Sequence, residues 1–125
     1  SAIANWKNCL KNILTHDSKT EPLERHMHYT HVGFVEEHAQ LQRVVFRASL
    51  VAAMRAKSDG VVALLVTASS KTDEYNGLKL IDSDGSAWAG DWELICEMIV
   101  NSVDLEFSLK NLNEVTIRGF PTTND

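Results

Sequence analysis

The stretch WELICEMIV at residues 92–100 decides the fold class that this sequence predicts. Every second residue from Trp92 to Val100 is apolar, and VDLEFSLK at residues 103–110 resumes the alternation. Because successive side chains of a strand point to opposite faces, a period of two predicts strands over residues 86–101 and 103–110. We therefore expect the C-terminal half to form an antiparallel sheet with one face in solvent.

Other segments extend this prediction. Residues 3–15 carry apolar side chains at three- and four-residue spacing, as in an amphipathic helix. Residues 61–68 are apolar on both faces and predict a central strand. Asn76-Gly77 is a favoured hairpin dipeptide, and residues 115–120 alternate once more as a last strand.

Residues 36–57 fit two structures. From residue 43 onward the apolar side chains alternate without a break, which favours a long strand. The same segment is rich in Ala, Leu, Met, Arg, Gln and Glu, which are strong helix formers. We favour the strand because its alternation is long, and keep a long helix packed across the sheet as the alternative.

The predicted fold class is therefore α+β, with residues 1–125 in a single domain. The helix over residues 3–15 packs on a twisted antiparallel sheet of five to seven strands, which can curl into a half-barrel or cone. The length of 125 residues is typical of one domain, and the composition is that of a globular protein, with 44% hydrophobic and 23% charged residues.

Charge and cysteine content bear on partners and location. The net charge of −5 makes nucleic-acid binding an unfavoured function, since that needs a basic face. No apolar run approaches the roughly 20 residues that span a bilayer, and no leader segment is evident, so we expect no membrane partner. Cys9 and Cys96 fall on predicted apolar faces, which indicates two buried free thiols and a cytoplasmic location.

Four of the five histidines lie between residues 26 and 38. In a strand, His26 and His28 would share a face with their Cβ atoms roughly 6–7 Å apart. Two imidazoles so placed can bind Zn²⁺, Ni²⁺ or Cu²⁺, with Glu36 or Glu37 completing the site. The alternatives are an exposed edge strand that happens to carry histidines, and a pair that responds to pH as the rings take up protons.

A second candidate site is apolar. Trp88 and Trp92 flank Gly90 and, with Tyr29 or Tyr75, can floor a pocket, so Tyr29, Trp88 and Trp92 are the predicted ligand-binding residues. The same side chains would serve equally well in a core.

Two polar clusters complete the candidates. Arg43, Arg47 and Arg55 share a face in the strand interpretation and can hold a carboxylate or phosphate. The alternative is an exposed face paired with Glu93, Glu97 or Glu106. Residues 82–86 faintly resemble a Ca²⁺-binding loop, but the ligand pattern is incomplete, and they predict a turn.

The sequence contains no nucleophile elbow, P-loop, dinucleotide-binding glycine motif or zinc-type cysteine pair. We therefore expect a non-catalytic binding or interaction module that forms a homodimer, with a small molecule or a protein as partner. One alternative is a small enzyme or ligand carrier with an apolar pocket in a cone-shaped sheet. The other is a metal-binding protein that uses His26 and His28. The sequence indicates no cofactor and leaves the enzyme question open.

Overall fold

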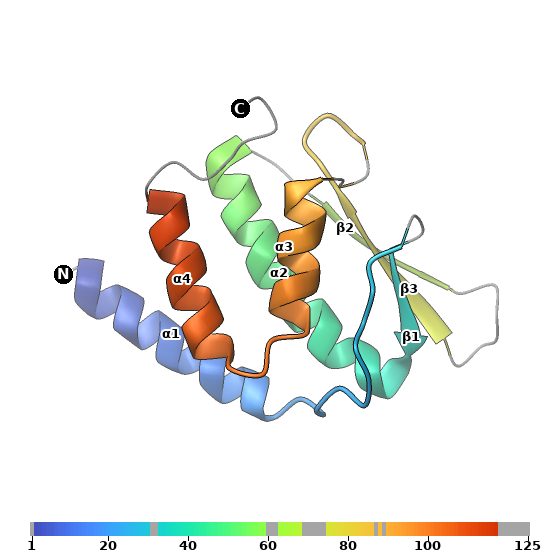
Figure 1. The fold of residues 1–125 in the computed structure, drawn as a ribbon, viewed down its shortest axis with the longest axis horizontal. Coiled ribbons are helices and arrows are strands. Elements are labelled where there is room, and N and C mark those ends of the chain that lie inside the picture. Colours follow the sequence, from blue (N-terminus) through green and yellow to red (C-terminus); the bar gives the residue numbers. More distant parts are fainter. Residues whose placement is uncertain are drawn as a thin grey trace.

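The computed structural model describes residues 2–30, 33–59, 63–68, 75–86, 88 and 90–117. Within this part of the chain the fold is α+β, as predicted (Figure 1). The elements in chain order are α1 (Ala2–Ser18), β1 (Phe34–Glu37), α2 (His38–Asp59), β2 (Ala63–Ala68), β3 (Tyr75–Ile81), α3 (Asp91–Val100) and α4 (Leu105–Ile117).

The sheet is antiparallel, with β3 between β1 and β2. Over the described residues it has three strands rather than five to seven, and β2, which falls within the predicted strand at 61–68, is an edge strand rather than a central one. Gly77 lies inside β3, opposite Val35 of β1 and Thr67 of β2. The hairpin predicted at Asn76-Gly77 is therefore wrong.

Helix α2 lies across the sheet and contacts all three strands. Helices α1 and α3 pack against α2, and α4 packs against both α1 and α3. In Figure 1 the sheet therefore lies at one end of the molecule, and α1 and α4 lie at the other. This arrangement places α2 at the centre, where it holds sheet and helices together.

The stretch at residues 92–100 is a helix, so the strand prediction there is wrong. In α3 the buried residues are Trp92, Cys96, Ile99 and Val100, at spacings of four, three and one, as one face of a helix requires. Trp92, Cys96 and Val100 fit both periods. The two-residue alternation arose because apolar Leu94 and Met98 lie on the exposed face, at 64% and 53% exposure.

The strand prediction for residues 103–110 fails in the same way. Helix α4 buries Leu105, Leu109 and Leu112 at helical spacing, whereas Val103 and Phe107 are exposed. The last strand, predicted at residues 115–120, is also wrong as far as the structure describes it, because α4 continues to Ile117.

Within the ambiguous segment at 36–57, residues 38–57 form helix rather than the favoured strand, and residues 36 and 37 end β1. After the short strand β1, α2 runs as 22 helical residues and buries Val44, Ala48, Val51 and Ala52 on one face. The helix propensities of the segment therefore predict its structure better than the alternation does. The N-terminal helix is confirmed as α1, but it packs against α2 and α4, and among the described residues it does not contact the sheet on which it was predicted to pack.

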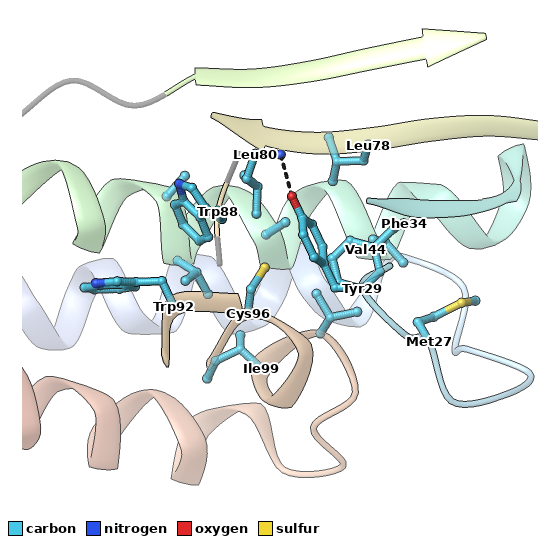
Figure 2. Packing of buried hydrophobic residues seen from close by; sticks show 14 of the residues in the cluster. Met27, Tyr29, Phe34, Val44, Leu78, Leu80, Trp88, Trp92, Cys96 and Ile99 are labelled. Atoms are coloured by element: carbon cyan, nitrogen blue, oxygen red, sulfur yellow. Dashed lines mark hydrogen bonds between the residues drawn. The ribbon is translucent and has the colours of Figure 1, made fainter. Parts of the chain in front are cut away.

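The core lies between the sheet, α2 and α3 (Figure 2). Its fully buried side chains include Phe34, Leu78, Leu80, Ile99 and Cys96. No helix in the described part of the chain is long and apolar enough to cross a membrane.

Candidate functional site

The residues from 26 to 29 pass beside α3 with alternating side chains. Met27 and Tyr29 are buried, while His26 and His28 are exposed. Asn101, which follows α3, fixes the backbone at the middle of this segment. Its Oδ1 accepts a hydrogen bond from the Met27 N–H at 2.6 Å, and its Nδ2 donates to the Met27 carbonyl at 2.7 Å. The two imidazoles are therefore held on the outside of the segment.

Glu97 lies one helical turn before Asn101 and faces the same segment. Its Oε1 is 2.8 Å from His28 Nδ1 and 3.9 Å from His26 Nε2. The two imidazole rings lie 4.6 Å apart between centroids. One ligand atom from each of the three side chains lies within 4.8 Å of the others, so the group has the dimensions of a metal site.

The structure thus brings together the predicted pair His26 and His28 and adds a carboxylate that the sequence analysis did not assign to it. The side chains of Glu36 and Glu37, the predicted third ligands, lie outside the described residues. Glu97 was missed because residues 92–100 were interpreted as a strand. In a helix, Glu97 and Asn101 fall on one face, and this spacing is the available sequence signal.

Tyr29, Trp88 and Trp92, the predicted ligand-binding residues, lie in the core (Figure 2). The Tyr29 hydroxyl accepts a hydrogen bond from the Leu80 N–H at 3.0 Å, and the Leu80 carbonyl accepts one from the Trp88 N–H at 3.1 Å. The two bonds give partners to the backbone N–H and carbonyl of Leu80, which lies in β3 beyond Leu78, where the pairing with β1 ends. Contact of these side chains with a ligand stays a prediction.

Burial changes the acid–base chemistry of two core groups. Burial raises the pKa of Tyr29 above its ordinary value, and the hydrogen bond from Leu80 opposes this. Burial, with a smaller contribution from the Glu97 charge, raises the pKa of the Cys96 thiol to about 12. Both cysteines are free, but Cys9 is exposed, which corrects the prediction that both thiols are buried.

The arginines of α2 have structural partners, so the prediction of an exposed arginine face on a strand is wrong. Arg47 binds Asp17 of α1 through two hydrogen bonds of 2.9 Å, and both side chains are buried. Arg55, whose side chain is 1% exposed, binds Asp82 at 3.1 and 2.9 Å. Its guanidinium carbon lies 5.1 Å from the centre of the Trp92 ring, a cation–π arrangement.

Arg43 acts at the end of α1. It donates hydrogen bonds to the Thr20 hydroxyl at 2.8 Å and to the carbonyls of Asp17 and Thr20 at 3.1 and 3.0 Å. A cation at this position satisfies free carbonyls and opposes the negative end of the helix dipole. The predicted turn at residues 82–86 is confirmed: the Gly85 N–H donates to the Asp82 carbonyl at 2.9 Å.

A groove of about 620 Å³ lies between α1 and α4. Leu10 and Leu14 contribute apolar surface to it, and Lys7, Lys11 and Lys110 line it with positive charge. Lysines attract anions, but the three lysines of this groove are exposed to solvent. Their electrostatic attraction for an anion is therefore weak and screened by salt. The groove therefore shows no feature that selects one ligand.

Comparisons with known proteins indicate an enzyme family. No protein-family model matches the chain. The chain is 30% identical over 97 residues to the "Probable phosphoacetylglucosamine mutase" of Encephalitozoon cuniculi, covering 76% of this chain and 18% of that protein. It is 36% identical over 76 residues to the phosphoacetylglucosamine mutase of Oryza sativa subsp. japonica, covering 59% of this chain and 14% of the relative.

The fold gives the same result. The solved structure of an N-acetylglucosamine-phosphate mutase in its substrate complex, a member of the α-D-phosphohexomutase superfamily, matches with a TM-score of 0.77 and 26% identity. The match covers 86% of this chain and 22% of that chain. The chain thus spans less than a fifth of the two curated relatives and about a fifth of the solved structure.

These similarities overturn the prediction of a non-catalytic binding or interaction module, because the similar proteins are enzymes. The alternative of an enzyme agrees with them better. The homodimer and the cytoplasmic location stay predictions.

Proposed function

We propose that this chain acts as one domain of an enzyme that moves a phosphoryl group on an N-acetylglucosamine phosphate. The observation that carries the proposal is the agreement of sequence and fold. An identity of 30% over 97 residues and a TM-score of 0.77 over 86% of the chain point to the same class of mutase. The substrate would be the sugar phosphate that the names of these proteins specify.

A domain within a larger enzyme fits the surface of the chain. Leu94 and Met98 are exposed one turn apart on α3, and Phe107 is exposed on the neighbouring helix α4. Leu64 and Val66, two residues apart on β2, are also exposed. Exposed apolar side chains grouped on one element are typical of a surface that another domain or subunit covers. The substrate site would then be shared with the domain or subunit that covers this surface.

A chimera tests the proposal. The matched segment of the Oryza sativa mutase is replaced by this chain. Conversion of N-acetylglucosamine 6-phosphate to the 1-phosphate is followed by phosphorus NMR, with Mg²⁺ and a catalytic amount of a hexose 1,6-bisphosphate. We expect the chimera to produce the 1-phosphate. The isolated chain should give none, because it covers only 14% of that relative.

The intact parent enzyme is the positive control, and the parent without the matched segment is the negative control. Size-exclusion chromatography and thermal melting establish that the chimera folds as the parent does. A folded chimera without mutase activity would contradict the proposal.

A further inference from the structure

The cluster of His26, His28 and Glu97, in which both imidazoles are exposed and the carboxylate is half-buried, is not used by the proposed function. We propose that these three side chains bind a divalent transition metal ion of the Zn²⁺ class. This inference stands independently of the mutase proposal, because it rests on the geometry of three side chains and on the backbone that positions them.

The separations within the cluster suit one small ion. A tetrahedral ion with bonds of about 2.0–2.1 Å holds its ligand atoms roughly 3.4 Å apart. His28 Nδ1 and Glu97 Oε1 are 2.8 Å apart, and His26 Nε2 is 3.9 Å from the same oxygen. Small side-chain rotations bring both separations to the required value. The imidazoles are free to make them, since the His26 and His28 side chains are 58% and 72% exposed.

The backbone that carries the two histidines is fixed before any ion binds. Met27, which is 4% exposed, is anchored on both sides: its side chain lies in the core, and its backbone N–H and carbonyl form hydrogen bonds with Asn101. In an extended segment the neighbours of a buried residue point outward, so His26 and His28 face solvent together. Glu97 lies on α3, one helical turn before Asn101. Because this backbone is already fixed, ion binding costs little backbone conformational entropy, and the cost that remains is the ordering of the two imidazole side chains.

The ligand types select the ion. Imidazole nitrogen suits Zn²⁺, Ni²⁺ and Cu²⁺, whereas Mg²⁺ and Ca²⁺ prefer oxygen ligands. Two imidazoles and one carboxylate also form the ligand set of several zinc enzymes, in which water or a substrate takes the fourth position. The bound ion would keep such a position open to solvent, because both imidazoles lie at the surface.

The test is a Zn²⁺ titration of untagged, chelator-treated chain by isothermal calorimetry. We expect one ion per chain. His28→Ala and Glu97→Gln should each raise the dissociation constant by at least the roughly 10- to 100-fold that loss of an outer-shell partner costs. His16→Ala and Glu106→Gln are the matched controls. Both replace exposed residues outside the cluster and should bind Zn²⁺ as the wild type does.

Thermal melting supplies a second measurement that includes a folding check. Zn²⁺ should raise the melting temperature of the wild type and of both controls, because an ion that binds only the folded state stabilises it. The same Zn²⁺ concentration should raise the melting temperature of Glu97→Gln much less than that of the wild type, and Mg²⁺ should raise it in no variant. The inference would be overturned if the wild type did not bind Zn²⁺. It would also be overturned if folded His28→Ala and Glu97→Gln bound Zn²⁺ with the same dissociation constant as the wild type.

Discussion

Arg47 of α2 and Asp17 of α1 form a buried bidentate ion pair that reaches beyond the two helices. The remaining guanidinium nitrogen, Nη1, donates to the carbonyls of Val100 and Ser102 at 3.1 and 2.7 Å, at the end of α3. A single side chain of α2 therefore binds both the last turn of α1, through Asp17, and the carbonyls at the end of α3. The pair satisfies charges that would otherwise be buried alone.

Replacing Asp17 by Asn should destabilise the chain by about 3–5 kcal/mol, because it leaves the Arg47 charge buried without its partner. Urea unfolding measures the free energy of unfolding. Glu106→Gln is the control, since Glu106 pairs with Lys110 at 3.5 Å on the surface. Loss of an exposed pair should cost about 0–1 kcal/mol. Equal losses for the two variants would show that the buried pair has no special role.

Tyr29→Phe should destabilise the chain by about 1–3 kcal/mol at neutral pH, because the buried Leu80 N–H loses its acceptor. It should also flatten the alkaline pH profile. The raised pKa of Tyr29 means that the folded state keeps the phenolic proton longer than the unfolded state does. Wild-type stability should therefore fall as pH rises past 10, the ordinary value, and fall less in the variant. Denaturant unfolding between neutral pH and pH about 11 measures this, and parallel profiles would contradict it.

The two thiols should differ in reactivity. The pKa of Cys96 is raised to about 12 and its side chain is buried, so almost none of it is thiolate at neutral pH. Cys9 is exposed. Iodoacetamide should alkylate Cys9 alone in the native chain and both cysteines in urea, as read by peptide mass spectrometry. Labelling of both at similar native rates would disprove the burial of Cys96.

Gly33→Ala should destabilise the chain more than Gly85→Ala. Both glycines have positive φ, 85° and 87°, so each alanine carries the backbone cost of about 1–2 kcal/mol. A Cβ at Gly33 would also overlap the Leu78 carbonyl oxygen, whereas one at Gly85 meets open space. The difference between the two melting temperatures isolates this overlap. Equal melting temperatures would mean that the backbone around Gly33 adjusts without cost.

The sequence predicts the α+β class, helix α1, the turn at residues 82–86 and the pair of histidines. It fails where apolar side chains lie in solvent. Leu94 and Met98 in α3, and Phe107 in α4, complete a two-residue alternation that the buried residues alone do not have. The spacing of apolar residues predicts secondary structure only where those residues face the core, and Leu94, Met98 and Phe107 face solvent.

The candidate site was half predicted for the same reason. His26 and His28 are neighbours in sequence, so local spacing finds them. Glu97 is 69 residues from His28, and the two come near where Asn101 binds the backbone of Met27 and the Met27 side chain is buried in the core. A hydrogen bond between a polar side chain and a distant backbone leaves no periodic pattern in the sequence. The alternation at residues 92–100 also predicts a strand there, and only a helix places Glu97 on the same face as Asn101.

The arginines of α2 have a consequence for how the chain comes apart. Arg43 forms hydrogen bonds at the end of α1, and Arg47 forms them at the end of α3. Arg55 binds Asp82 in the turn after β3. These arginine contacts form only when α2 is in place, so fraying at these three positions is coupled to the loss of α2. Amide protons in the last turns of α1 and α3 should then exchange with solvent only through a shared, large-scale opening.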